Sequence, residues 1–86
     1  MKNKVLIKLF VSELDASFDL FIPVNELIWK VKKMIIKSVS DLLSIPLNMD
    51  DDYILINKNT GDIYNNNIVV IDTNIRNCTE LMIVKK

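Results

Sequence analysis

Residues 22–46, IPVNELIWKVKKMIIKSVSDLLSIP, decide the fold of this chain because they describe one long amphipathic helix between two prolines. Pro23 cannot donate a ladder hydrogen bond and closes the strand before it, and Pro46 disfavours helical angles at the residue preceding it. Asn25 is the predicted helix cap, and the helix is predicted to end near Leu43. The apolar positions that predict one buried helical face are Leu27, Ile28, Val31, Met34, Ile35, Val39 and Leu42.

Two strands are predicted on the N-terminal side of this helix. Residues 4–11 and 17–22 each alternate apolar side chains with others, which is the period of a strand with one buried face. The turn-forming residues 12–15 separate the two runs. We therefore expect an antiparallel hairpin that leads into the helix.

Shorter elements are predicted on the C-terminal side of the helix. Gly61, the single glycine, lies in the strongest turn signal of the chain, at 57–62. Ile75 is expected to point inward from the turn that 72–74 begin. The predicted strands are 53–56, a short return at 63–64, an apolar run at 68–71 and a closing strand at 79–84.

The length and hydrophobicity of the chain match one domain covering residues 1–86. Half of the 86 residues are hydrophobic, which is enough for a single core. No signal peptide is visible, and the apolar runs are far shorter than the ~20 residues that a membrane-spanning helix needs. We expect a cytoplasmic protein that does not insert into a membrane.

Composition argues against several classes of function. Lys plus Arg and Asp plus Glu number 11 each, so the basic excess that nucleic-acid binding requires is missing. The sequence has no histidine and one cysteine, Cys78, which rules out a Cys–His pair, a histidine metal site and an internal disulfide. The acidic run 50–52 lacks the spacing of a calcium loop. We expect no catalysis, no metal and no other cofactor.

The predicted order is that of an α+β β-grasp fold, in which a mixed four- to five-stranded sheet wraps one long helix. Its pieces resemble ubiquitin along nearly the whole chain. Ile22-Pro23 precedes the helix, Ser44-Ile45-Pro46 follows it, and IDTNI at 71–75 and TELMIV at 79–84 match the end of that fold. The chain is therefore identified as a ubiquitin-like protein.

The printed sequence ends in LMIVKK at 81–86, without the Gly-Gly that ubiquitin-like modifiers and sulfur carriers use. In layout and ending it is most similar to the small YukD/EsaB proteins. That resemblance implies a cytoplasmic accessory component of a type VII (WXG100/Esx) secretion system of Gram-positive bacteria, which binds a membrane subunit or ATPase of the machine. The alternatives are a modifier or sulfur carrier, and a ubiquitin-like domain of an unrelated assembly.

Two surfaces are predicted to bind a protein partner. On the sheet, strand alternation directs apolar side chains away from the core, and the ubiquitin resemblance places Leu55 at the centre of the patch. The members of this predicted sheet surface are Leu6, Phe10, Phe21, Leu55, Met82 and Val84. Their burial would support a micromolar contact or a weak homodimer.

The second predicted surface lies on the helix, to one side of its core face. Trp29, Ile36 and Leu43 recur there every seven residues, and tryptophan is favoured where binding energy concentrates. The alternative is that the loop 45–49 folds over these side chains.

Overall fold

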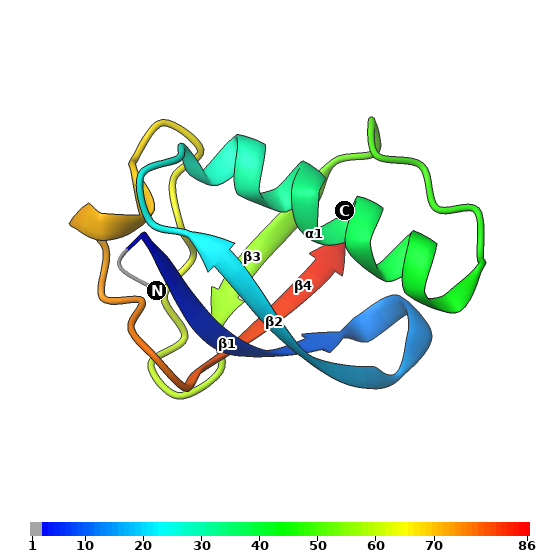
Figure 1. The fold of residues 1–86 in the computed structure, drawn as a ribbon, viewed down its shortest axis with the longest axis horizontal. Coiled ribbons are helices and arrows are strands. Elements are labelled where there is room, and N and C mark those ends of the chain that lie inside the picture. The colour runs from blue at the N-terminus through cyan, green and yellow to red at the C-terminus, as the bar shows by residue number, and fades with distance from the viewer. Residues whose placement is uncertain (1–2) are drawn as a thin grey trace.

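The computed structural model describes residues 3–86 (Figure 1). Two 3-10 helices, labelled η, accompany the strands and the α-helix. The elements are β1 (Lys4–Val11), η1 (Ser12–Leu14), β2 (Ala16–Pro23), α1 (Ile28–Leu43), β3 (Tyr53–Asn57), η2 (Val70–Asp72) and β4 (Thr79–Lys85).

The four strands form one mixed sheet in the order β2-β1-β4-β3. β1 pairs antiparallel with β2 and parallel with β4, and β3 pairs antiparallel with β4. The strands nearest the two ends of the described chain are therefore neighbours at the centre of the sheet, where Ile7 lies beside Thr79. This is the predicted β-grasp order.

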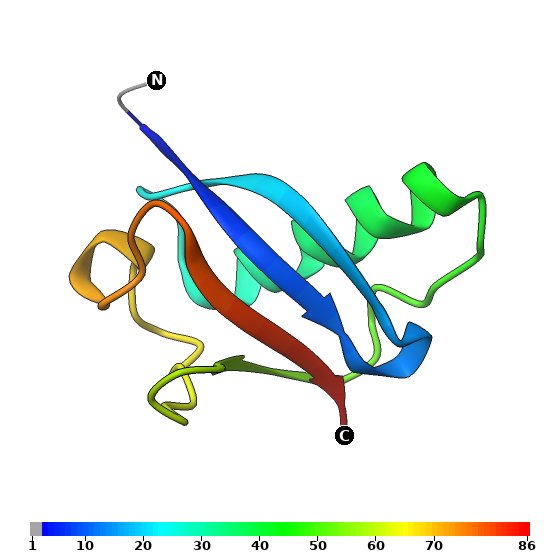
Figure 2. The same cartoon turned by 90° about the horizontal axis from the view of Figure 1, so that it is seen from below.

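The core lies between α1 and the sheet face on which it packs (Figure 2). Alternate residues of each strand point toward the helix, as the period of a strand requires. The buried strand residues include Ile7, Leu9, Val11, Ile22, Leu55, Leu81 and Ile83. Each fully buried aliphatic side chain contributes about 1.5–3 kcal/mol relative to exposure.

The start of α1 differs from the prediction. Leu27, not Asn25, is the capping residue, and its side chain makes no capping hydrogen bond. Instead, the backbone amides of Ile28 and Trp29 donate to the carbonyl oxygens of Ile68 (2.9 Å) and Asn66 (3.3 Å). A segment about 40 residues further along the chain thus satisfies amides that a local side chain satisfies in most helices.

The buried face of α1 is rotated relative to the predicted one. Met34 and Leu42 were placed in the core, but their side chains are 47% and 64% exposed. Ile36 is buried instead, with 1% of its surface exposed. The helix ends at Leu43 as predicted, where Ser44 adopts a left-handed conformation with a φ of 53°.

The free edge of β3 is covered by the chain itself. Residues 63–64 form no strand: Ile63 makes a single bridge to Ile56. The amide of Tyr64 donates to the carbonyl of Leu55 (3.1 Å), and that of Asn57 donates to the carbonyl of Asp62 (2.9 Å). The turn at 57–62 returns the chain along this edge, with Gly61 in the left-handed region at a φ of 79°.

Ile75 is buried, as predicted from the turn before it, while the apolar run at 68–71 forms η2 and a single bridge from Val69 to Leu27 instead of a strand. No helix within residues 3–86 is long and apolar enough to cross a bilayer.

Candidate functional site

The face of the sheet turned away from α1 is the first candidate site, and we call it the outer sheet face. Its residues alternate along each strand with the buried ones, so their side chains point to the opposite side. Leu6, Phe10, Met82 and Val84 are half-buried on this face, and Phe21 is 55% exposed. The structure thus brings five of the six predicted sheet residues to one face.

Leu55 is the exception, and its predicted orientation is wrong. Its side chain is 0% exposed and lies in the core, directly across the strand pair from the buried Ile83. The outward positions of β3 are Ile54 and Ile56, which sequence reasoning missed. The run Tyr53-Ile54-Leu55-Ile56 is apolar throughout, so it carries no alternation that would set the phase of the strand.

Ile54 and Ile56 complete an apolar cluster at one end of the outer sheet face. Ile56 lies opposite Met82, which in turn lies beside Phe10, and Ile54 lies opposite Val84. Directly opposed residues have Cβ atoms about 4.5–5.5 Å apart, which brings their side chains into contact. We call Phe10, Ile54, Ile56, Met82 and Val84 the apolar cluster.

A charged row separates this cluster from Leu6 and Phe21. Lys8 pairs with Asp19 on one side and Glu80 on the other, so three charged side chains cross the sheet between the two apolar groups. The predicted single patch is therefore two patches. A shallow recess of about 290 Å³ follows the charged row. At its rim the ammonium group of Lys58 lies 5.3 Å from the centre of the Phe10 ring.

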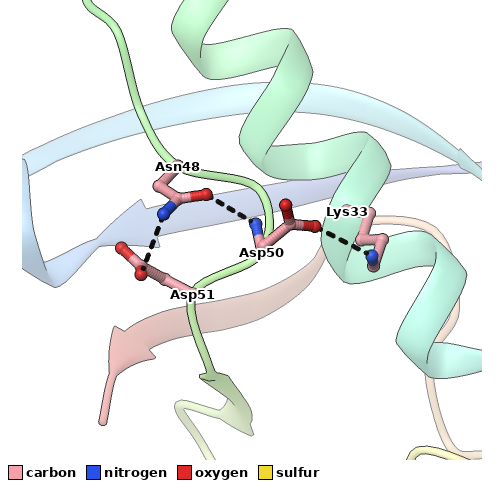
Figure 3. Close-up of polar contacts among 4 residues, drawn as sticks. All are labelled: Lys33, Asn48, Asp50 and Asp51. Carbon is pink, nitrogen blue, oxygen red and sulfur yellow. Dashed lines mark hydrogen bonds and ion pairs between the residues drawn. The ribbon is translucent and has the colours of Figure 1, made fainter.

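A second recess, of about 200 Å³, lies between α1 and the loop that leads into β3. In Figure 3 Asp50 points toward Lys33, whose Nζ lies 3.4 Å from its Oδ1. Asn48 holds the loop in shape, since its Oδ1 accepts from the amide of Asp50 (2.9 Å). The residues lining this recess are Trp29, Lys32, Lys33, Met49, Asp50, Asp51, Asp52, Tyr53 and Asn66.

The predicted helix surface does not form as a continuous stripe. Ile36 is buried in the core, because α1 is rotated from the predicted phase. Trp29 and Leu43 are 38% and 37% exposed, but no side chain of the predicted set joins them. Met49 lines the same recess as Trp29, so the loop borders the indole ring without burying it.

The acidic run at 50–52 is neutralised by lysines. Asp50 pairs with Lys33, Asp51 with Lys85 (2.9 Å) and Asp52 with Lys86 (3.5 Å). The hydrogen bond to Asp51 raises the pKa of Lys85 above its ordinary value of 10.5. Among residues 3–86 no three His, Cys, Asp or Glu side chains gather as metal ligands would.

Among residues 3–86, Lys32 is the one Lys or Arg residue that is partly buried. Its Nζ donates to the carbonyl of Tyr53 (2.7 Å) on the free edge of β3. Partial burial lowers the pKa of Lys32 below its ordinary value of 10.5, and the nearby carboxylate of Asp52 opposes that shift. This lysine joins α1 to the sheet, so we assign it a structural role.

A mixed sheet in the order β2-β1-β4-β3, with one helix packed on one face, is the arrangement of a β-grasp fold. No family model and no curated protein sequence matches the chain. Solved structures do match in fold. The chain is similar to the EccD5 ubiquitin-like domain from Mycobacterium xenopi, with a TM-score of 0.75 and 12% identity over 96% of this chain and 94% of that one.

Two further solved structures extend this likeness. A chain of the MycP5-free ESX-5 inner membrane complex matches with a TM-score of 0.78 and 10% identity over 98% of this chain, which spans 21% of that longer one. The ubiquitin-like domain of Plasmodium falciparum Dsk2 matches with a TM-score of 0.73 and 13% identity, covering 96% of this chain and 99% of that domain. The chain therefore has a ubiquitin-like β-grasp fold.

Proposed function

We propose that this chain is a ubiquitin-like adaptor that acts by non-covalent binding of a protein partner. Its setting would be the cytoplasmic side of a type VII (WXG100/Esx) secretion system of a Gram-positive bacterium. The partner would be a membrane subunit or ATPase of that machine. The single cysteine fits the reducing conditions of a cytoplasm.

The observation that carries the proposal is the apolar cluster on the outer sheet face. The residues of this cluster lie next to one another on three strands, and each keeps part of its surface in water. They are Phe10, Ile54, Ile56, Met82 and Val84. Completing their burial contributes at most ~1.5–3 kcal/mol per side chain. Association costs ~4–15 kcal/mol, so the balance supports a contact of micromolar strength.

The secretion setting is supported by likeness of fold alone. EccD5 gives its name to one of the similar structures, and another is a chain of the ESX-5 inner membrane complex. Both match this chain in fold over at least 96% of its length. The resemblance to YukD/EsaB in layout points to the same machinery.

Charge reversal within the cluster tests the proposal. Met82→Asp places a carboxylate at the centre of the apolar cluster, and Ile54→Asp places one on its β3 side. Each should weaken capture of the partner by about tenfold or more, because a buried unpaired charge opposes binding. Leu42→Asp is the matched control, since Leu42 is exposed on α1 and faces away from the outer sheet face. The partner is captured by cross-linking in the cells that produce the protein and identified by mass spectrometry.

Circular dichroism must show that all three variants are folded. If folded Ile54→Asp and Met82→Asp chains retain every partner of the unmodified chain, the outer sheet face is not the binding site. If the captured proteins include no component of a secretion machine, the proposed setting is wrong. An ATP-dependent thioester on the chain would contradict purely non-covalent action.

A further inference from the structure

The two edges of the sheet differ in what covers them, and β2 forms the open one. β2 is the outermost strand on its side and pairs only with β1. The register between them runs without a bulge from Lys4 opposite Pro23 to Val11 opposite Ala16. An uninterrupted edge strand of this length is a template for another strand.

The hydrogen bonds around β1 show which groups of β2 are free. The amide and carbonyl of Leu6 are bonded to Asn77 (3.0 Å) and Cys78 (2.7 Å), on the β4 side. Neighbouring residues of a strand direct these groups to opposite sides, so Val5, Ile7, Leu9 and Val11 bond to β2. The amide of Val24, which donates to the carbonyl of Asn3 (2.9 Å), continues this pattern.

It follows that Ala16, Phe18, Leu20 and Ile22 direct their backbone groups to β1, as the register requires. Ser17, Asp19 and Phe21 direct theirs to the open edge. Within residues 3–86, no hydrogen bond from outside the β1–β2 pair reaches these groups. The ligand that matches amides and carbonyls repeating at this spacing is an extended chain.

We propose that the occupant of this edge is a second copy of the same chain, with β2 pairing antiparallel to β2. Two observations favour a second copy. The protein has no net charge, which removes the long-range repulsion that keeps identical molecules apart. The second observation is that the side chains of two antiparallel β2 strands match one another in one register.

In that register Leu20 lies on the two-fold axis, opposite Leu20 of the second copy. Asp19 of one copy and Phe21 of the other then exchange backbone hydrogen bonds across the interface. The amide of Ser17 donates to the carbonyl of Pro23. Proline has no amide to return, so the carbonyl of Ser17 alone stays unpaired. Phe18 faces Ile22, an aromatic–β-branched pair of the kind that stabilises sheets. In the alternative register Asp19 lies on the two-fold axis, opposite Asp19 of the second copy. Repulsion between the two carboxylates disfavours that register.

The recess beside β2 supports the same arrangement. Met34 of α1 and Phe21 of β2 line it together, and both side chains are about half exposed in the single chain. A strand added at the edge continues the sheet past this recess. The inward-facing Leu20 and Ile22 of the second copy would then cover Met34, which was expected in the core.

Sedimentation equilibrium from micromolar to millimolar concentration, combined with amide hydrogen exchange by NMR, tests the proposal on the unmodified chain. The expected result is a reversible dimer in which the amides of Ser17, Asp19 and Phe21 gain protection as concentration rises. The amides of Phe18 and Leu20, already bonded to β1, should be protected throughout. A chain that stays monomeric at millimolar concentration overturns the proposal, and so does a dimer in which the three edge amides exchange unchanged.

A matched pair of variants tests the role of the edge amide. Asp19→Pro removes an amide that points to the open edge and should weaken dimerisation by about tenfold or more. Asp19→Asn removes the charge and keeps the amide, so it should dimerise at least as well as the unmodified chain. Equal dimerisation of folded Asp19→Pro contradicts the proposal. Neither variant touches the apolar cluster, so the result is independent of the adaptor hypothesis.

Disulfide cross-linking tests the register. In a Cys78→Ser background, Leu20→Cys places two sulfurs across the two-fold axis, where opposed residues lie about 4.5 Å apart at Cα, within disulfide reach. Asp19→Cys would cross-link only in the disfavoured register. We expect cross-linking of the first and not of the second, and the reverse result overturns the proposed pairing. Protection of the edge amides by an added extended peptide, in a chain that remains monomeric, would overturn it as well.

Discussion

The two edge strands of the sheet, β2 and β3, both direct backbone amides and carbonyls away from the sheet. On β3 the chain itself covers these groups, and on β2 it leaves them open. On β3, the carbonyl of Tyr53 accepts from the Lys32 ammonium group, and that of Leu55 accepts from the amide of Tyr64. On β2, the corresponding groups of Asp19 and Phe21 form no hydrogen bond within the described chain. The backbone groups of an edge strand can bond to a loop of the same chain or stay free to pair with another strand. In this molecule β3 shows the first arrangement and β2 the second.

The difference follows from where the chain travels after each strand. Asn57 ends β3 in a tight turn, and the next residues come back along the same edge. Pro23 ends β2, and the chain leaves at once for α1, which packs on the face and not on the edge. The covered edge should therefore contribute to stability of the single molecule, and the open edge should contribute almost nothing to it.

The largest expected effect comes from the side chain that anchors the covered edge strand. Leu55→Ala should lower the free energy of unfolding by about 2–5 kcal/mol, because it opens a cavity in a fully buried site. Phe21→Ala on the open edge strand should change it by less than about 1 kcal/mol, since that ring is mostly exposed. Urea denaturation measures both. Similar losses would mean that Leu55 faces outward after all.

Proline substitution at adjacent positions of β2 compares its two sides. Leu20→Pro removes an amide bonded to the carbonyl of Ile7 and leaves that carbonyl buried and unpaired, so we expect a loss of about 3 kcal/mol or more. Asp19→Pro removes an amide that faces the open edge, and the dilute protein should lose less than about 1 kcal/mol. Thermal unfolding at low concentration separates the two. Equal losses would show that the β2 edge is covered.

The turn that covers β3 depends on one buried polar side chain. Asn57 is nearly inaccessible, and its Oδ1 accepts from the amides of Asn59 (2.9 Å) and Thr60 (3.1 Å) while its Nδ2 donates to the hydroxyl of Tyr64 (3.1 Å). Asn57→Ala leaves these amides without their acceptor and should cost about 1–3 kcal/mol. Hydrogen exchange should show faster opening of the turn and of the β3 edge. An unchanged exchange rate there contradicts the role of this turn.

The smallest expected effect is a dependence on alkaline pH. Burial raises the pKa of Tyr64 above its ordinary value of 10.0, and the charge of Asp62 adds to that shift while the hydrogen bond from Asn57 opposes it. Above pH 10 the unfolded chain therefore releases this proton while the folded chain still holds it, so stability should fall as pH rises from there. Tyr64→Phe should reduce the slope. Absorbance titration of the tyrosines checks the direction of the shift.

The predicted features that hold are those set by local alternation. β1, β2 and β4 contain clear alternating positions, so the outward placement of Phe10 and Met82 could be predicted from sequence. The end of α1 was also predictable, because Pro46 acts on the residue next to it. The order of elements then allowed only a few topologies, of which the β-grasp is one.

The features that failed depend on contacts between distant segments. β3 is apolar at every position from Tyr53 to Ile56, so only its pairing with β4 determines that Leu55 points inward. The start of α1 is satisfied by carbonyl groups of Asn66 and Ile68, which no pattern around Asn25 reveals. Isoleucine at two neighbouring helical positions likewise left the buried face undetermined, and Ile36 was assigned to the wrong side.

The parallel pairing of β1 with β4 has a consequence for folding during synthesis on the ribosome. Ile7 lies beside Thr79 and Val11 beside Ile83, so the central contact of the sheet joins early and late parts of the chain. On a ribosome, β1, β2 and α1 emerge first and can form only local structure, because residues 79–85 are still unmade. Pairings between distant residues also form slowly. Until β4 is made, the backbone groups of β1 that face it, such as those of Leu6, have no partner, and in that interval this chain is most open to chaperones and to misassembly.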